Sequence, residues 1–261
     1  MNFDSRQIYK HLDIITGKDR NEDDIKIWLY DVVDPKECFS SYDFVGRAIP
    51  VIRDIMDRGK VPILIGGTYL YLYHLLYKVE TEHIPPDLNL RQQLNKEAVN
   101  ALQKKLEQID AELYDNLNES DRYNPQRLIR KIEIARHYKK RGMKVPVKMR
   151  FVFNDFFKNN DVEIFGLHYK NKSDLQDAIT MRVQKRREQG AVEEVRNLLV
   201  NGYTADDPGL QTIGYQQMIK YVKGMLTEEQ AIREWITKEI QYAKRQITFM
   251  KKDPNIKWKL I

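Results

Sequence analysis

The stretch Val61-Pro62-Ile63-Leu64-Ile65-Gly66-Gly67-Thr68 decides the predicted fold class of this chain of 261 residues. A short apolar run that ends in two glycines is typical of a buried parallel strand followed by a tight turn. Helical spacing of apolar residues predicts one helix over residues 40–59, with a kink at Pro50, and a second helix over residues 69–77. Helix, strand, glycine turn and helix in this order are the repeating unit of an α/β fold with a parallel sheet.

Beyond this unit the apolar pattern indicates a helical insertion. From residue 91 the leucines and isoleucines keep helical spacing, and no further strand is indicated until residues 162–167. We therefore predict an α/β core formed by residues 1–90 and 151–261, which continues into C-terminal helices. An all-helical domain is predicted over residues 91–150.

Capping residues predict several helix boundaries. Asn124, which a proline follows, is a strong start signal for a helix within the insertion. Ser173 is predicted to cap the helix after the second strand, and Gly190 to break it. Thr227 has a glutamine three residues later, which predicts a capping box at the start of a long final helix.

Composition limits the class of protein. Hydrophobic residues make up 42% of the chain and charged residues 31%, as in globular proteins. No run approaches the roughly 18 consecutive apolar residues of a membrane helix, and the first residues lack the pattern of a signal peptide. We therefore expect a cytoplasmic protein without membrane attachment. Cys38 is the single cysteine, so neither an internal disulfide nor a zinc site is expected.

The distribution of charge is compatible with a polyanionic partner. Lys and Arg number 44 against 38 Asp and Glu, which gives a net charge of +6. Basic residues gather in three segments, at residues 127–141, 182–187 and 244–252. Each segment alone is compatible with an ordinary solvated helix face. The three together, two of them beside aromatic residues, favour a nucleic acid partner.

Polar residues at the ends of predicted strands are candidates for a site. The carboxylate of Asp4 is compatible with a general base at a sheet edge or with a cap of a following helix. The turn Gly66-Gly67-Thr68 is compatible with a ligand-binding helix N-terminus or with a plain strand-to-helix turn. Arg182 lies on the apolar side of its helix, where it suits a diphosphate or a buried salt bridge.

Several motifs then follow one another along the chain. They are Asp4-Ser5-Arg6-Gln7-Ile8-Tyr9, Asp31-Val32-Val33-Asp34-Pro35, Pro62-Ile63-Leu64-Ile65-Gly66-Gly67-Thr68-Tyr69-Leu70-Tyr71, Asn124-Pro125-Gln126-Arg127-Leu128-Ile129-Arg130, Arg182-Val183 before Gly190, Ile213-Gly214-Tyr215, and Tyr242-Ala243-Lys244-Arg245-Gln246-Ile247-Thr248-Phe249. In this order they resemble the motifs of the tRNA dimethylallyltransferase (isopentenyl transferase) family, and the match spans nearly the whole chain.

The resemblance implies a P-loop-NTPase-like parallel sheet core and a prenyl transfer. A dimethylallyl group would pass from dimethylallyl diphosphate to the exocyclic amine of the adenosine on the 3′ side of a tRNA anticodon. By motif, the catalytic residues would be Asp4 as general base, Thr68, and Arg182, which would hold the leaving diphosphate together with Mg²⁺. Gly66 and Gly67 would also lie against the diphosphate, and the protein would act as a monomer.

The resemblance further implies contacts with the anticodon stem-loop of tRNA. The residues that match tRNA-contacting positions are Asp4, Ser5, Arg6, Gln7, Thr68, Arg91, Gln126, Arg127, Leu128, Ile129, Arg130, Gln211, Thr212, Ile213, Gly214, Tyr215, Gln216, Lys244, Arg245, Gln246, Ile247, Thr248, Phe249, Met250 and Lys251. Binding through phosphate contacts is expected to weaken steeply as salt rises.

The sequence departs from the family pattern in two notable ways. No Gly-x-x-x-x-Gly-Lys-Ser/Thr occurs in it, whereas family members carry this phosphate-binding loop before the Asp4 motif. The strand, loop and helix concerned would comprise roughly 30 residues, and without them we expect an unpaired sheet edge. Glu239-Ile240 replaces a Thr-Arg pair before Tyr242, on a helix that is expected to contact tRNA.

Three hypotheses remain open at this point. We favour an active transferase of which these residues are a fragment, because Asp4, Thr68 and Arg182 are all present. The second hypothesis is a truncated, catalytically impaired homologue that binds tRNA. The third is an enzyme that prenylates free AMP, which the basic insertion and C-terminal segment disfavour.

Overall fold

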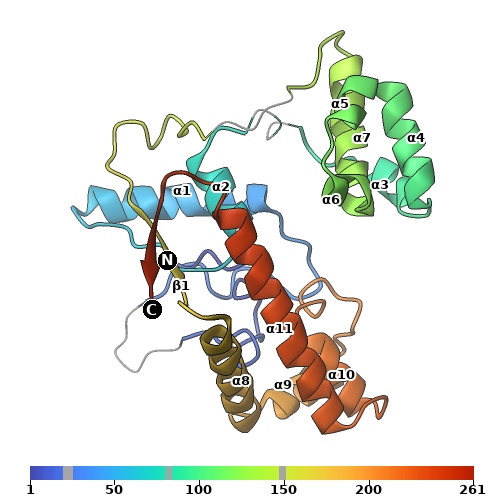
Figure 1. Cartoon of the computed structure of the whole chain (residues 1–261). Coiled ribbons are helices and arrows are strands. Elements are labelled where there is room, and N and C mark those ends of the chain that lie inside the picture. Colours follow the sequence, from blue (N-terminus) through green and yellow to red (C-terminus); the bar gives the residue numbers. More distant parts are fainter. Residues whose placement is uncertain (20–25, 80, 82–83, 147–150) are drawn as a thin grey trace. The chain divides into compact units, whose positions relative to one another are not determined.

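The computed structural model describes residues 1–19, 26–79, 81, 84–146 and 151–261 of the chain. Figure 1 shows helices joined by turns and extended segments, with a small sheet. The elements in chain order are α1 (Ser41–Asp57), α2 (Tyr69–Leu76), α3 (Leu88–Leu94), α4 (Val99–Ile109), α5 (Ala111–Asp115), α6 (Glu119–Arg122), α7 (Pro125–Lys139), β1 (Ile164–His168), α8 (Lys172–Glu188), α9 (Ala191–Val200), α10 (Tyr215–Val222), α11 (Glu228–Met250) and β2 (Ile256–Leu260). No helix among the described residues combines the length and the apolar character needed to cross a membrane.

The chain forms two compact units. Unit 1 comprises Met1–Leu76 together with Phe153–Ile261, and unit 2 comprises Tyr77–Val152. The chain therefore leaves unit 1 once and returns to it. The sequence analysis places the helical domain at residues 91–150, of which residues 147–150 lie outside the described part of the chain.

Helix α1 begins and ends at its sequence signals. The Ser40 hydroxyl accepts a hydrogen bond from the Asp43 N–H, and the Asp43 carboxylate accepts one from the Ser40 N–H, which completes a capping box. The helix continues past Pro50 and buries Phe44 on its inner face. Gly59 follows the helix with a φ of 68°, in the left-handed region that favours glycine.

The segment 61–65 is not a buried strand in the part of the chain that the structure describes. Ile65 forms an isolated parallel bridge with Asn2, and Ile63 and Ile65 are 67% and 73% exposed. The prediction of a buried strand here was wrong, because a strand is buried only when neighbours cover both of its faces. Within the described part of the chain, the backbone of this segment pairs instead with residues 1–3.

The sheet that the structure does show joins β1 to β2 in parallel, with Ile164 opposite Ile256. Strand β1 lies close to the predicted strand at residues 162–167. Strand β2 was missed, although its sequence alternates apolar residues with lysines, the pattern of a half-exposed strand. The fold is α/β, with a high helical content and a small parallel sheet.

The predicted helix boundaries agree with the structure at three of four positions. Asn124 caps α7, Thr227 begins a capping box at α11, and Gly190 separates α8 from α9 with a φ of 105°. Ser173 was wrong as a cap, because the N-cap of α8 is Asn171, two residues earlier. An Asn and a Ser so close together both suit a cap, and local sequence does not choose between them.

Unit 2 has a hydrophobic core of its own. Leucines from α3, α4 and α5 pack against the apolar face of α7 in one buried cluster. Leu94, Leu102, Leu106, Leu128 and Ile132 are each at most 1% exposed. The helical spacing of these residues in the sequence therefore corresponds to a shared core.

Candidate active site

Asp4 lies in a turn of unit 1 whose shape is set by side-chain hydrogen bonds. The buried Asn2 accepts a hydrogen bond from the Asp4 N–H at 2.8 Å and donates one to the Leu29 carbonyl at 3.2 Å. Asp4 Oδ1 accepts a hydrogen bond from the Arg6 N–H at 2.8 Å, as in an Asx turn. Residues 5–8 form turns and no helix, so the alternative that Asp4 caps a helix is wrong.

The turn Gly66-Gly67-Thr68 is brought against Asp4 by close backbone packing. A Cβ atom on Gly66 would lie 2.7 Å from the carbonyl carbon of Phe3 and 2.8 Å from the Asp4 nitrogen. Glycine is therefore required here, because any side chain would push the two backbones apart. Thr68 Oγ1 accepts a hydrogen bond from the Ser5 N–H at 2.9 Å and donates one to Ser5 Oγ at 3.0 Å, which joins the two segments.

The surroundings of Asp4 increase its affinity for a proton. Burial raises the pKa of the Asp4 carboxyl above its ordinary value. The hydrogen bond from the Arg6 N–H and the positive charges of Arg6 and Arg186 act in the opposite direction without cancelling the effect of burial. A carboxylate with a raised pKa is a stronger general base near neutral pH.

Helix α11 contributes two further groups to this site. Gln246 Nε2 donates a hydrogen bond to the Gly67 carbonyl at 2.6 Å, and a Cβ atom on Gly67 would overlap that amide. Tyr242, one turn earlier, hydrogen-bonds to the Thr68 side chain, and burial and the charge of Asp4 raise its pKa. Both residues belong to one sequence motif, but only Gln246 was predicted as a site residue, although a spacing of four places both on one face of a helix.

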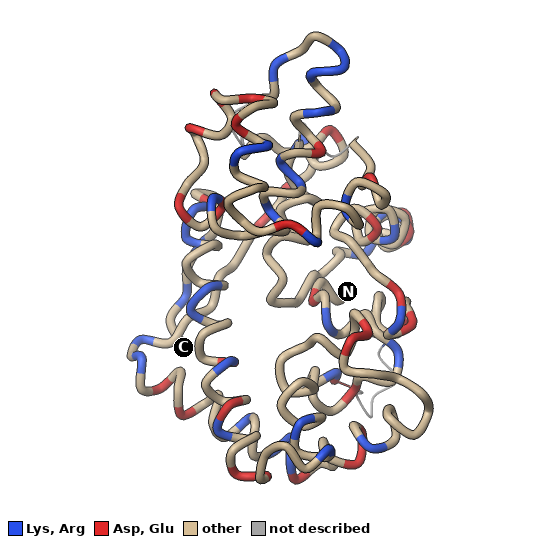
Figure 2. Tube along the Cα trace, turned by 90° about the vertical axis from the view of Figure 1, so that its right-hand side faces the viewer, with Lys and Arg blue, Asp and Glu red and all other residues tan. Residues whose placement is uncertain are grey.

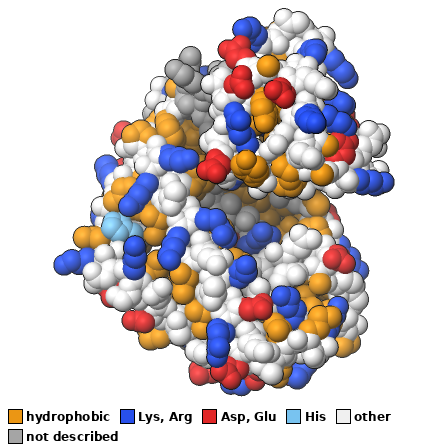
Figure 3. Space-filling model, turned by 45° about the vertical axis from the view of Figure 1, so that its right-hand side comes forward, with side chains coloured by type: hydrophobic (Ala, Val, Ile, Leu, Met, Phe, Trp, Pro, Cys, Tyr) orange, Lys and Arg blue, Asp and Glu red, His pale blue; other side chains and the backbone are white. Residues whose placement is uncertain are grey.

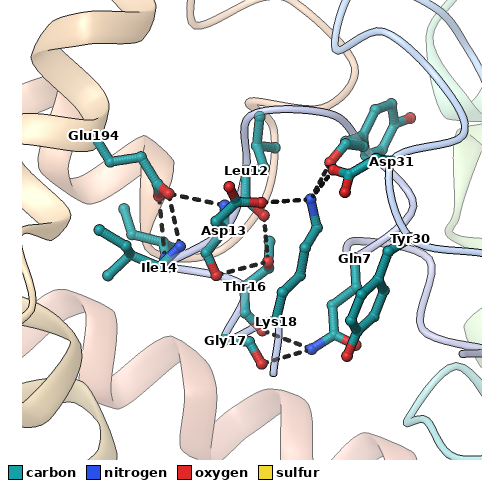
Figure 4. A network of polar contacts seen from close by, with 12 residues as sticks. Gln7, Leu12, Asp13, Ile14, Thr16, Gly17, Lys18, Tyr30, Asp31 and Glu194 are labelled. Atoms are coloured by element: carbon teal, nitrogen blue, oxygen red, sulfur yellow. Dashed lines mark hydrogen bonds and ion pairs between the residues drawn. The ribbon is translucent and has the colours of Figure 1, made fainter. Parts of the chain in front are cut away.

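The loop of residues 12–18 is anchored at its end by a buried ammonium group. The Lys18 side chain is fully buried, and its Nζ donates to the Tyr9 carbonyl at 2.6 Å. It also lies 2.8 Å from Asp13 Oδ1 and 2.7 Å from Asp31 Oδ1. Figure 4 shows the ammonium between the two carboxylates. One cation thus joins two distant parts of the chain to the loop.

The middle of the same loop is held by Glu194, from α9. Its carboxylate accepts hydrogen bonds from the three consecutive N–H groups of residues 13–15, at 2.8, 2.6 and 3.1 Å (Figure 4). The loop then presents the carbonyls of Thr16 and Gly17 to Gln7 Nε2, at 3.1 and 2.9 Å. With its Nε2 engaged, the Gln7 side chain offers Oε1 as an acceptor to a ligand.

Helix α8 places Arg186, and not Arg182, in the interior of unit 1. The Arg182 side chain is 47% exposed, whereas the Arg186 side chain is 14% exposed and donates to the Thr16 carbonyl at 3.3 Å. The predicted inward orientation of Arg182 was wrong. Val183 is buried, and the residue that shares its helix face is Arg186, three positions later. Arg186 was missed within a basic segment, although this spacing is visible in the sequence.

Sequence comparison assigns the chain to a family. Residues 7–253 match the family model described as IPP transferase. The tRNA dimethylallyltransferase of Caldanaerobacter subterraneus subsp. tengcongensis is 34% identical over 98% of this chain and 81% of its own length. The chain belongs to the IPP transferase family.

Solved structures of IPP transferases resemble this fold. The full-length tRNA isopentenylpyrophosphate transferase from Bacillus halodurans superposes with a TM-score of 0.68 at 32% identity, over 99% of this chain and 80% of that one. A eukaryotic dimethylallyltransferase acting on tRNA superposes with a TM-score of 0.70 at 26% identity, over 95% of this chain and 62% of that one.

Two arginines of the IPP transferase motifs in unit 2 are engaged in internal ion pairs. Glu133, 4% exposed, accepts hydrogen bonds from Arg91 Nε at 2.7 Å and Nη2 at 2.9 Å. Arg130 Nη1 donates to the same carboxylate at 3.1 Å, and its Nη2 donates to the Thr81 and Ile84 carbonyls. These arginines stabilise the fold of unit 2.

The neighbouring positions of α7 divide between the core and the surface. Leu128 and Ile129 are 0% and 1% exposed, so their side chains pack inside unit 2, and contact of these positions with tRNA stays a prediction. Gln126 and Arg127 are exposed, and Arg127 pairs with Asp121 at 2.7 Å. A helix that packs on one face exposes only part of any consecutive run.

The segment 211–216 divides in the same way. Thr212 and Tyr215 are 6% and 0% exposed, and the Tyr215 hydroxyl donates to Glu194 at 2.5 Å. Both side chains are thus used inside unit 1, and contact of these positions with tRNA stays a prediction. Gln211 is exposed, Ile213 and Gln216 are half-buried, and Gly214 is buried.

The last part of α11 presents cations to solvent. The exposed residues of the predicted tRNA-contacting run are Lys244, Arg245, Thr248 and Lys251. Ile247 and Met250 are half-buried, and Phe249 packs edge-on against Tyr69 with ring centres 5.0 Å apart. Figure 2 shows Lys and Arg in many parts of the trace, with acidic residues also present, and Figure 3 shows them among apolar side chains on the face that it presents. The cations of α11 are thus one group in a mixed surface.

The described residues do not form a magnesium site by themselves. No group of three or more His, Cys, Asp or Glu side chains converges among them as possible metal ligands. In enzymes that act on phosphates, Mg²⁺ is commonly held by substrate oxygens and water with only one or two carboxylates. An ion carried by a diphosphate would need few side-chain ligands from the protein.

Proposed function

We propose that this chain is a tRNA dimethylallyltransferase that acts as a monomer in the cytoplasm. It transfers a dimethylallyl group from dimethylallyl diphosphate to the exocyclic amine of the adenosine on the 3′ side of the anticodon. The observation that carries the proposal is the shielded Asp4 carboxylate with its raised pKa, packed against Gly66-Gly67-Thr68. Family membership and the names of the relatives support the same reaction.

Asp4 acts as the general base. The amine nitrogen forms a bond to the first carbon of the dimethylallyl group while the bond from that carbon to the diphosphate oxygen breaks. Diphosphate leaves with the electron pair of the broken bond, and the amine proton passes to the Asp4 carboxylate. A base with a raised pKa suits this transfer, and the adenine must leave its stack to reach it.

Thr68 and Gln7 orient the adenine. Thr68 is held by Ser5 and Tyr242, and Gln7 by the loop carbonyls, so both side chains have restricted rotamers before a ligand arrives. Positioning by groups that are already ordered lowers the entropy cost of reaching the reactive geometry. This arrangement favours one orientation of the base.

Arg182 and Arg186 hold the diphosphate, together with the backbone at Gly66 and Gly67. Guanidinium groups form bidentate hydrogen bonds with phosphate oxygens and stabilise the charge that develops on the leaving group. Mg²⁺, if carried by the diphosphate, would supply further positive charge there. A P-loop-like arrangement of the core, which the family resemblance implies, is part of this proposal.

The exposed cations of the predicted set bind tRNA. Arg127 in unit 2, and Lys244, Arg245 and Lys251 in unit 1, are exposed and carry the charge that phosphates require.

Transfer of radiolabelled dimethylallyl diphosphate to tRNA and to AMP tests the proposal directly. We expect label on tRNA, and none on a matched tRNA with guanosine at the acceptor position, which lacks the N6 amine. Preference for AMP would identify an adenylate prenyltransferase instead. Tight tRNA binding without transfer would identify a tRNA-binding homologue.

A further inference from the structure

Two arginines on α8 share one carboxylate on α11. Arg182 Nη2 donates to Glu239 Oε2 at 2.7 Å, and Arg186 Nη1 lies 3.7 Å from Glu239 Oε1. The same Oε1 accepts a hydrogen bond from the indole N–H of the buried Trp235 at 3.2 Å. Glu239 is 13% exposed, so its charge is largely shielded from water. One anion thus serves two cations and a buried donor.

The arginine pair needs an anion between its members. The guanidinium group of Arg186 packs directly against Gly17 in unit 1. A Cβ atom on this residue would overlap the guanidinium group, and its φ of 68° also favours glycine. Burial and the neighbouring charge of Arg182 lower the pKa of Arg186. Two like charges so close together repel unless a negative group compensates them. In this structure Glu239 is that group.

We propose that Glu239 is an internal counter-ion that occupies the place of a diphosphate at Arg182 and Arg186 and so sets the affinity for that ligand. This inference rests on the proposed role of the two arginines. A diphosphate carries more negative charge than one carboxylate and offers more acceptor oxygens, so it displaces Glu239 from Arg182. Binding then costs the broken ion pair and leaves a shielded carboxylate near the ligand.

The substitution Glu239→Gln removes the negative charge of this side chain and leaves its packing nearly unchanged. The glutamine retains an oxygen that can accept the Trp235 hydrogen bond, and its volume is nearly unchanged. Glu228→Gln is the matched control, because Glu228 joins the same two helices through Arg187 at 2.7 Å, outside the shared pair. Glu239→Thr, which removes the carboxylate and shortens the side chain, provides a second variant if the glutamine destabilises the fold.

Isothermal titration of inorganic pyrophosphate into the full chain, at low salt and without divalent ions, measures the effect. We expect Glu239→Gln to bind about tenfold tighter than the unchanged chain, because it removes one repulsive charge close to the ligand. Glu228→Gln should bind as the unchanged chain does, and adding Arg182→Gln to Glu239→Gln should remove the gain.

Equal or weaker binding by both Glu239 variants would overturn the inference while leaving the diphosphate site in place. If neither the unchanged chain nor any variant binds pyrophosphate, the assignment of the two arginines to diphosphate fails, and the inference fails with it.

Discussion

Two shielded carboxylates, Asp4 in unit 1 and Glu133 in unit 2, respond to their surroundings in opposite ways. Burial favours a raised pKa at both. At Glu133 the hydrogen bonds from Arg91, Arg130 and the Asp87 N–H outweigh burial, and the pKa is lowered. At Asp4 the Arg6 N–H and the nearby positive charges do not outweigh burial, and the pKa is raised.

The opposite pKa shifts distinguish a carboxylate that stabilises the fold from one that is available to a ligand. Glu133 has a full set of partners from its own unit, so it stabilises a fold. Asp4 is shielded with fewer partners, and therefore keeps a proton affinity that a ligand can use. Both side chains are carboxylates whose burial favours a raised pKa, and the hydrogen bonds from arginine side chains that only Glu133 accepts distinguish them.

The largest expected effect is that of Asp4→Ala on transfer. The loss of a general base should lower the rate of transfer by about 10²–10⁴-fold, while tRNA affinity stays close to that of the unchanged chain. Single-turnover transfer and a tRNA binding assay measure the two quantities. Asp54→Ala, at an exposed aspartate of α1, is the control and should transfer normally. If tRNA affinity fell as much as the rate of transfer, Asp4 would have a structural role, as Glu133 has.

Glu133→Gln should have the next largest effect, on stability. Removing the charge from a buried carboxylate that serves two arginines should cost about 2–3 kcal/mol, which urea unfolding measures. Because the pKa of Glu133 is lowered, this stabilisation is present above the ordinary value of 4.5 and is lost as the pH falls through the lower folded value.

The stability difference between Glu133→Gln and the unchanged chain should therefore shrink in acid. Glu112→Gln removes a fully exposed partner of Lys144 and should change stability little. Equal effects of the two variants at neutral pH would show that the buried network contributes no more than a surface pair.

Lys244→Ala should weaken tRNA binding modestly and reduce its salt dependence. An exposed lysine that neutralises one phosphate contributes about one unit to the slope of log affinity against log salt. Titrations at several salt concentrations measure that slope. Lys60→Ala, at another exposed lysine of unit 1, is the control and should leave the slope unchanged. An unchanged slope in Lys244→Ala would remove this lysine from the tRNA interface.

The smallest expected effect is a shift in pH dependence from Arg6→Gln. The positive charge of Arg6 lowers the pKa of Asp4, so its removal should raise that pKa further. Because the base acts when deprotonated, the acidic limb of the kcat/KM profile should move to higher pH. Arg58→Gln, which is remote and paired with Asp54, should leave the limb in place. A shift of the limb to lower pH in Arg6→Gln would contradict the assignment of Asp4 as the base.

Much of the local structure was predictable because its causes are local. The caps at Ser40, Asn124 and Thr227 each depend on a few consecutive residues, and all three begin helices in the structure. The sequence also named Asp4 and Thr68, which the fold brings together through Ser5.

The errors arose where burial depends on distant partners. Ile63 and Ile65 belong to an apolar run that is typical of a buried strand, but both side chains are largely exposed. Burial requires neighbouring segments, which the sequence of the run does not specify. Leu128 and Ile129 stand in a motif that resembles a tRNA-contacting run, yet they fill the core of unit 2. Side-chain type sets what a residue can do, and packing decides which face it occupies.

The sequence by itself determined the family, the order of the helices, and Asp4 and Thr68 as candidates, because motifs and capping signals are properties of consecutive residues. Only the tertiary structure decided that Arg186 lies inward, that Glu239 holds the arginine pair, and that Asp4 keeps a raised pKa while Glu133 does not. These properties depend on groups far apart in the chain, whose distances and shielding from water exist only once the chain has folded.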